Sequence, residues 1–91
     1  MGTAVVKIKV MPESPESDLG AIQEKATEML KEKNIENPQF EIQPIAFGLK
    51  ALYIVFGWPE EDDTLEDFEG NLNSLEDVGS AEIVDMRRAV G

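Results

Sequence analysis

The apolar residues of this chain change their spacing along the sequence, and the order of these spacings is the feature that most restricts the possible folds. In residues 6–10, Val6, Ile8 and Val10 alternate with two lysines. Such alternation is typical of a strand with one buried and one solvent-facing side. After Pro12, intervals of three and four predict an amphipathic helix that ends near Lys33 and Asn34, with the apolar face Leu19, Ile22, Ala26, Met29 and Leu30.

Two further strands are predicted in the middle of the chain. Phe40 and Ile42 alternate with polar residues, and Pro44 should lie near the end of their strand or on a sheet edge. The segment Leu49–Trp58 is apolar at nearly every position, which predicts a strand at the sheet centre. We expect its helix-facing side chains to be Leu52, Ile54 and Phe56.

The last third of the sequence predicts a second helix and a final strand. The apolar face of this helix is expected to be Leu65, Phe68, Leu72 and Leu75. Thr64 and Asp67 have the spacing of a capping box, with Asp in place of the preferred Glu. After Gly79, residues 82–88 are predicted to form the fourth strand, although their alternation is poor.

The resulting order, β-α-β-β-α-β with short connections, predicts an α+β fold of the ferredoxin-like type. In this plait a four-stranded antiparallel sheet carries both helices on one face. A chain of 91 residues suffices for one compact domain, so residues 1–91 are expected to form a single domain. On the uncovered face, an apolar trio would be left in water, which suggests self-association, a covering loop or protein docking. The residues expected on that face are Lys7, Lys9, Glu41, Ala51, Tyr53 and Val55, and the trio is Ala51, Tyr53 and Val55.

Charge and composition exclude several classes of function. The chain has 19 acidic and 8 basic side chains and a net charge of -11, which disfavours nucleic acids and anionic membranes and favours a basic partner. It has no Cys or His, which excludes disulfides, thiol nucleophiles, imidazole catalysis and the usual zinc ligands. No apolar run approaches the ~20 residues that span a bilayer. We therefore expect a cytoplasmic, non-enzymatic protein without a metal or cofactor.

The acidic residues 60–63 lack the glycine and the spacing of an EF-hand loop. They are better explained by the positive end of the helix that follows them.

Two blocks of residues resemble the archaeal elongation factor 1-beta family, and the resemblance extends over the whole chain. The first block is Val10-Met11-Pro12-Glu13-Ser14-Pro15-Glu16. The second and more specific block is Glu41-Ile42-Gln43-Pro44-Ile45-Ala46-Phe47-Gly48-Leu49-Lys50-Ala51-Leu52. The ending Val84-Asp85-Met86-Arg87-Arg88 is also similar. The resemblance implies a guanine nucleotide exchange factor that displaces GDP from the GTPase elongation factor 1-alpha during translation.

The resemblance also implies where the GTPase binds. In this family the Phe of the Ala-Phe-Gly turn docks into the GTPase, a role that falls on Phe47 with Ala46, Gly48 and Lys50 beside it. From the pattern alone, a Phe next to Gly is more often packed inside than presented. A basic residue near the C-terminus of eukaryotic members approaches the magnesium site, a role that falls on Arg88, with Arg87 beside it. Those members have Lys there, and Arg and Lys are not interchangeable at an ion site.

The two expected contact regions should lie at opposite ends of the sheet. The turn with Phe47 is predicted at the same end as the loop 11–17 and the turn at Gly79. Arg87 and Arg88 are expected roughly 25 Å away, at the other end of strands of seven or eight residues. A partner that contacts both ends must be large.

Three alternative functions of the same fold remain open. An RNA-binding module would need alternating aromatic residues on the open face beside basic ones, where this chain offers Tyr53 alone. A hydrolase of the acylphosphatase type would need a phosphate-binding loop after the first strand, where this chain has Met11-Pro12-Glu13-Ser14. A ligand-sensing regulatory module would dimerise through the sheet, and its test is a stable dimer with a bound metabolite.

Overall fold

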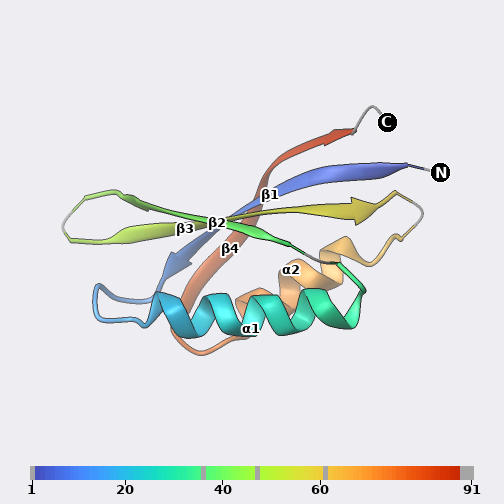
Figure 1. Ribbon diagram of the computed structural model, residues 1–91. Coiled ribbons are helices and arrows are strands. Elements are labelled where there is room, and N and C mark those ends of the chain that lie inside the picture. Colours follow the sequence, from blue (N-terminus) through green and yellow to red (C-terminus); the bar gives the residue numbers. More distant parts are fainter. Residues whose placement is uncertain (1, 36, 47, 61, 89–91) are drawn as a thin grey trace.

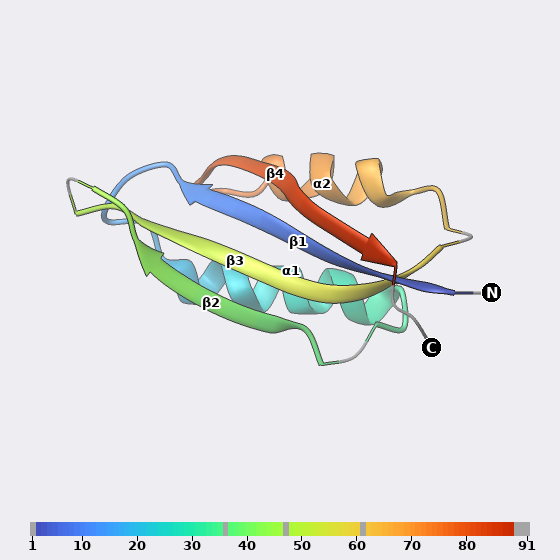
Figure 2. The same cartoon turned by 90° about the horizontal axis from the view of Figure 1, so that it is seen from above.

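The computed structural model describes residues 2–35, 37–46, 48–60 and 62–88. Its six elements are β1 (Thr3–Pro12), α1 (Leu19–Glu32), β2 (Gln39–Pro44), β3 (Lys50–Pro59), α2 (Leu65–Asn73) and β4 (Val78–Arg88). All neighbouring strands are antiparallel, in the order β2-β3-β1-β4. Both helices cover the same face of this sheet (Figures 1 and 2). The predicted ferredoxin-like plait is therefore confirmed.

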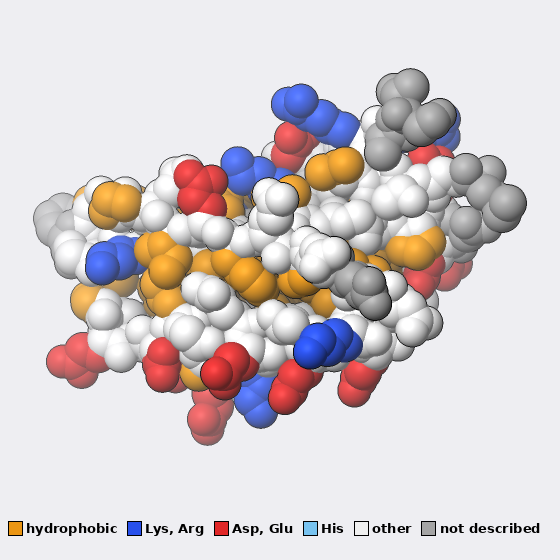
Figure 3. Space-filling model, viewed as in Figure 1, with side chains coloured by type: hydrophobic (Ala, Val, Ile, Leu, Met, Phe, Trp, Pro, Cys, Tyr) orange, Lys and Arg blue, Asp and Glu red, His pale blue; other side chains and the backbone are white. Residues whose placement is uncertain are grey.

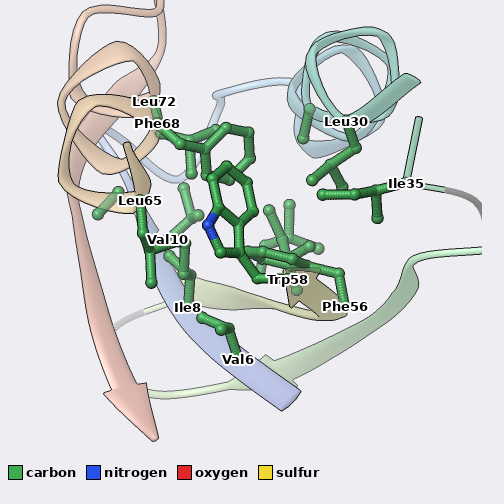
Figure 4. Close-up of a cluster of buried hydrophobic side chains, with 14 of the residues drawn as sticks. Val6, Ile8, Val10, Leu30, Ile35, Phe56, Trp58, Leu65, Phe68 and Leu72 are labelled. Atoms are coloured by element: carbon green, nitrogen blue, oxygen red, sulfur yellow. The ribbon is translucent and has the colours of Figure 1, made fainter. Parts of the chain in front are cut away.

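The core lies between the sheet and the two helices. The alternating side chains of β1 that face the helices, Val6, Ile8 and Val10, are fully buried. They meet Leu30 of α1 and Leu72 of α2 in one cluster (Figure 4). The expected inward residues of β3, Leu52, Ile54 and Phe56, belong to the same cluster. The hydrophobic pattern thus identified the core side of both central strands.

Three aromatic rings fix one end of the core, where β3 approaches α2. The ring of Phe56 lies edge-on to Trp58 and to Phe68, with centroids 5.9 and 5.4 Å apart. Such edge-to-face pairs add about 0.5–1.5 kcal/mol to the effect of burial alone. The indole nitrogen of Trp58 donates a hydrogen bond to the backbone oxygen of Asp62 (3.0 Å). This bond holds the loop before α2 against the end of β3.

Helix α1 is capped at both ends, and it ends where the sequence predicts. Asp18 caps the N-terminus, where its carboxylate accepts a hydrogen bond from the backbone nitrogen of Ala21 (3.2 Å). Lys33 caps the C-terminus, and Asn34 follows with a positive φ of 60°. An asparagine tolerates this left-handed conformation better than most residues.

Helix α2 differs from its prediction in two ways. It ends at Asn73, so Leu75 lies beyond the helix and packs on the core from the following turn. The expected capping box does not form, since the Thr64 side chain makes no capping hydrogen bond. The Thr64 hydroxyl donates instead to the carboxylate of Asp62, which also accepts the backbone N–H of Thr64 (2.9 Å). Asp62 competes successfully with the N-terminus of α2 for the Thr64 hydroxyl, because it lies only two residues away in the loop.

Strand β4 begins at Val78, earlier than the predicted start at Glu82. Its pairing with β1 shifts register between Lys7 and Ile8, where Asp85 and Ile83 are the partners and Val84 has none. This bulge explains the poor alternation, because one extra residue reverses the side of every residue after it.

Strand β2 is an edge strand that ends at Pro44, as expected. The backbone nitrogen of Ile45 donates to Leu49 (2.8 Å), so residues 45, 43, 41 and 39 direct their backbone groups toward β3. Pro44 therefore occupies an outward position, where its missing N–H removes no bond of the sheet.

The uncovered face exposes less apolar surface than predicted. Ala51 is completely buried, because its methyl group lies in an internal strand beside longer side chains such as Gln43 opposite it. Tyr53 and Val55 are half-buried. The ammonium group of Lys7 lies 4.8 Å from the centre of the Tyr53 ring, a cation–π contact. No described helix is long and apolar enough to cross a membrane.

Candidate functional site

The turn between β2 and β3 carries the first group of expected partner-binding residues. Hydrogen bonds from Ile45 to Leu49 (2.8 Å) and from Leu49 to Ala46 (3.0 Å) fix the base of this turn. Gly48 has a φ of 77°, which a glycine adopts without strain. Apart from the adjacent residues, no atom lies within 4 Å of the position that a Cβ would take at Gly48, so this position faces open space. Phe47 itself lies outside the described residues.

The same end of the sheet holds the two other segments that were expected there. Gly48 and Lys50 line a cavity of about 300 Å³ together with Pro12 at the end of β1 and residues of the β1–α1 loop, among them Ser14 and Ser17. The backbone nitrogen of Glu13 donates to Asp77 (2.8 Å), which joins that loop to the turn before β4. Ala46, Gly48 and Lys50 are all exposed. This end of the molecule is called the tip below.

Arg87 and Arg88 lie at the other end, where β4 finishes beside the start of β1 (Figure 1). Arg87 pairs with Asp85 (Nε–Oδ2, 3.1 Å) and Arg88 with Glu60 (Nε–Oε2, 3.5 Å). The two arginine side chains are 78% and 85% exposed. Ion pairs with such exposure contribute little to stability, so both guanidinium groups remain available to a partner.

Glu60 reaches Arg88 across the chain start. Its backbone nitrogen donates to Gly2 (3.0 Å), and its carboxylate lies where a Cβ of Gly2 would be, 2.6 Å from Oε1. The absence of a side chain at Gly2 thus gives the carboxylate room beside the end of β4.

A cleft of about 490 Å³ opens beside the two arginines, between the last residues of β4 and the start of α2. Its apolar lining is Ala4, Trp58, Pro59, Leu65, Ile83 and Met86, and its charged lining is Glu60, Asp62, Asp63, Glu66, Arg87 and Arg88. Four carboxylates against two guanidinium groups make it acidic. It is called the β4–α2 cleft below.

Asp62 in this cleft is held in its charged form. The hydrogen bonds from the Thr64 hydroxyl and backbone, with the nearby Lys33 ammonium (3.5 Å), keep the pKa of Asp62 below its usual value. Lys33 also donates to the Thr64 hydroxyl (2.9 Å) and lies 5.8 Å from the centre of the Trp58 ring. Asp62 is therefore already engaged by α1 and its own loop.

The structure brings the expected residues together as two groups rather than one. Ala46, Gly48 and Lys50 gather at the tip, and Arg87 and Arg88 lie at the opposite end of a molecule 42 Å long. In the described part of the chain, no three acidic residues are grouped so that they could hold a metal ion. The arrangement offers two contact surfaces at opposite ends of one sheet.

Three exposed apolar residues near these surfaces were not singled out from the sequence. Ile45 at the tip is 46% exposed, and Val84 and Met86 at the end of β4 are 44% and 52% exposed. The sequence signal that could have identified Ile45 is an apolar residue next to Pro44. For Val84 and Met86 it is an apolar residue within a strand of poor alternation. The view in Figure 3 shows a different apolar band, between α1 and β2, with acidic side chains along the outer side of α1.

Comparisons with known proteins agree with each other. A family model described as the EF-1 guanine nucleotide exchange domain matches residues 5–89. A protein named elongation factor 1-beta from Nanoarchaeum equitans is 40% identical over 82 residues, which are 90% of this chain and 100% of that protein. The proteins of that name from Methanobrevibacter smithii and Methanocaldococcus jannaschii are 40% and 35% identical, over 97% and 98% of this chain and 98% and 100% of their own.

Among solved structures, one named BlrP1 BLUF has a TM-score of 0.64 and 13% identity. The alignment covers all of this chain and 57% of that one. At this identity the likeness concerns the fold alone.

Proposed function

Since the chain belongs to the EF-1 guanine nucleotide exchange domain family, we propose that it promotes the release of GDP from the GTPase elongation factor 1-alpha during translation elongation. The observation that carries this proposal is the family match over residues 5–89, which includes both the tip and the end of β4. We propose further that residues 1–91 act as one exchange domain.

The mechanism that we propose is differential binding. A protein that binds the nucleotide-free GTPase more tightly than its GDP complex weakens GDP binding by the same factor. Such an effect requires contact surfaces and no bond-making step. It is consistent with a chain that has no Cys or His and whose arginines are exposed at the end of β4.

The two ends of the sheet suggest a division of this work. We propose that Phe47, Ala46, Gly48 and Lys50 dock on one part of the GTPase and thereby position the molecule. Arg87 and Arg88 then lie on the side of the nucleotide, where their positive charge competes with the cation that bridges the GTPase and the phosphates. The sheet between them links the two contact surfaces, so that docking at the tip places the arginines beside the nucleotide.

The test is the release of a fluorescent GDP analogue from an archaeal elongation factor 1-alpha, with this protein at substoichiometric amounts. Faster release with several turnovers per molecule supports the proposed function. An unchanged rate on a GTPase that a known exchange factor accelerates would contradict it. Magnesium chelation serves as the positive control, because removal of the cation releases nucleotide without the protein.

A further inference from the structure

Side chains of α2 close the first part of the outer edge of β4. The amide group of Asn73 binds both backbone groups of Ala81 (2.9 Å each), and the Glu69 carboxylate accepts the backbone N–H of Ile83 (2.8 Å). An edge strand whose outward groups are satisfied in this way cannot pair with another chain. The protection stops at Ile83, since no described side chain binds the backbone of Met86 or Arg88.

The backbone groups of Met86 and Arg88 point away from the sheet. The bond from Glu60 to Gly2 sets the alternation along β1, so that residues 3, 5, 7 and 9 direct their backbone groups toward β4. The partners of Val5 and Lys7 are Arg87 and Asp85, which therefore face inward. Met86 lies between Asp85 and Arg87, and Arg88 follows Arg87. The backbone N–H and C=O groups of Met86 and Arg88 therefore point outward. Figure 1 shows this part of β4 rising away from α2.

This open edge borders the β4–α2 cleft, which has an apolar floor and an acidic rim. Met86 and Ile83 belong to both the strand and the cleft lining. Among the carboxylates of the rim, Asp62 pairs with Lys33 and Glu60 with Arg88, whereas Asp63 and Glu66 make no ion pair within the described part of the chain. The free edge and the cleft together match the features of β-strand addition, in which main-chain bonds supply affinity and pockets select side chains.

We propose that the outer edge of β4 at Met86 and Arg88 binds an extended segment of the GTPase as an additional strand. Every second side chain of this segment lies on the helix side of the sheet. One of these side chains is apolar and covers Met86, and the next is Lys or Arg and reaches Asp63 and Glu66. This inference rests on the proposed function, because the added strand comes from the GTPase. Arg87 and Arg88, which we propose to act on that GTPase, line the same cleft. It adds a main-chain interface to the side-chain contacts proposed above.

The decisive variant is Met86→Pro, compared with Met86→Ala. Proline removes the outward N–H but no bond to β1, as Pro44 does on the other edge, whereas alanine removes only the side chain. We expect Met86→Pro to bind the nucleotide-free GTPase roughly tenfold more weakly than Met86→Ala, through the lost hydrogen bond and the hindered approach of the added strand. Equal affinities of the two folded variants would overturn the proposal.

Ile42→Pro is the matched control, because Ile42 occupies an outward position on the opposite edge strand β2. Its GTPase affinity should equal that of the wild type. An equal loss in Ile42→Pro and Met86→Pro would show a general effect of proline and contradict the proposal. If the wild type itself does not accelerate GDP release, the proposed function fails first, which is distinguishable from a failure of the strand alone.

Amide hydrogen exchange of the wild-type protein tests the same interface without any substitution. In the complex with the nucleotide-free GTPase, the N–H groups of Met86 and Arg88 should exchange at least tenfold more slowly, as hydrogen-bonded amides do. The outward amide of Ile42 should not change. Binding without slower exchange at Met86 and Arg88 would exclude strand addition.

Charge reversal tests the acidic rim. The double variant Asp63→Lys, Glu66→Lys should weaken GTPase binding by at least tenfold at low salt and less at high salt, because exposed charges are screened. Glu24→Lys, Glu28→Lys on the exposed side of α1 changes the net charge equally and serves as the control. Equal weakening by both pairs would assign the effect to net charge and contradict a basic segment in the cleft.

Discussion

Asn73 and Ala81 are paired as if they belonged to neighbouring strands. The side-chain nitrogen of Asn73 donates to the backbone oxygen of Ala81, and the backbone nitrogen of Ala81 donates to the side-chain oxygen of Asn73, each at 2.9 Å. A helix side chain thereby takes the place of a fifth strand at the edge of the sheet. Because Ala81 is buried, its backbone groups depend on this pair for their hydrogen bonds.

We therefore expect Asn73→Ala to lower the free energy of unfolding by about 1–3 kcal/mol, the usual cost of leaving buried polar groups without partners. Asn73→Asp should also destabilise, because a carboxylate accepts from the Ala81 nitrogen but cannot donate to its oxygen. Urea denaturation followed by circular dichroism measures both effects. Asn71→Ala, an exposed change in the same helix, is the control. Its free energy of unfolding should stay within about 0.5 kcal/mol of the wild-type value.

The lowered pKa of Asp62 predicts how Thr64 contributes to stability at different pH values. The hydrogen bond from the Thr64 hydroxyl is the largest single cause of the lowered pKa, and Thr64→Val removes it. A lowered pKa in the folded state stabilises the protein above the unfolded pKa, and this stabilisation is lost as the pH falls through the folded value. Thr64→Val should therefore be less stable than the wild type at pH 7, and the difference should shrink below about pH 4.

Urea midpoints of both proteins at several pH values provide the measurement. Thr27→Val is a suitable control, since the Thr27 hydroxyl bonds only to the backbone oxygen of Gln23 in α1 (2.8 Å). Its difference from the wild type should not depend on pH between 7 and 3. A pH-independent loss in Thr64→Val would mean that the hydroxyl acts through packing rather than through the Asp62 carboxylate.

Local spacing was sufficient to predict the fold and most of the core. Val6, Ile8 and Val10 are buried because a strand places every second side chain on one face, a rule that needs no knowledge of the partner strands. The end of α1 near Lys33 and Asn34 was predicted for similarly local reasons. These features depend on the chain within a few residues.

The features that sequence analysis missed depend on residues distant in the chain. The bulge at Val84 requires the register of β4 against β1, and the burial of Ala51 requires its neighbours on adjacent strands. Likewise, Thr64 was expected to form a capping box with Asp67 but bonds to Asp62, whose position is fixed by Trp58 and Lys33. The site residues at the tip and at the end of β4 came from a family resemblance, and their roles remain predictions.

The backbone at Gly48 makes a prediction about the tip. Its φ of 77° is unfavourable for residues with a Cβ, while the space around it is open. Gly48→Ala should therefore cost roughly 1 kcal/mol of stability through backbone strain alone. Gly48→Asn should cost less, because asparagine tolerates this conformation. Thermal denaturation of the two variants measures the difference; equal losses would show that contacts of the new side chain, rather than φ, decide the cost.

The exposed arginines predict a separation of exchange from binding. In the double variant Arg87→Ala, Arg88→Ala, the maximal rate of GDP release should fall by about tenfold or more, while the affinity for nucleotide-free GTPase changes less. Stability should hardly change, since both ion pairs are exposed. Stopped-flow nucleotide release and a binding titration measure the two quantities. The double lysine variant keeps the charge and should retain more of the rate; an undiminished rate in the alanine variant would remove both arginines from the mechanism.

Phe47 carries the last prediction, because both of its neighbours, Ala46 and Gly48, are exposed and the space beside Gly48 is open. A large aromatic side chain that docks on a partner often contributes 2 kcal/mol or more of binding energy, so Phe47→Ala should weaken GTPase binding by roughly thirtyfold or more. Exchange at low protein concentration should fall by the same factor. Circular dichroism and urea denaturation should remain unchanged, because a docking residue supports no core. Ile42→Ala, also an exposed apolar residue but in β2, is the control for a general loss of surface. If Phe47→Ala unfolds the protein instead, Phe47 is a core residue and the tip needs another docking group.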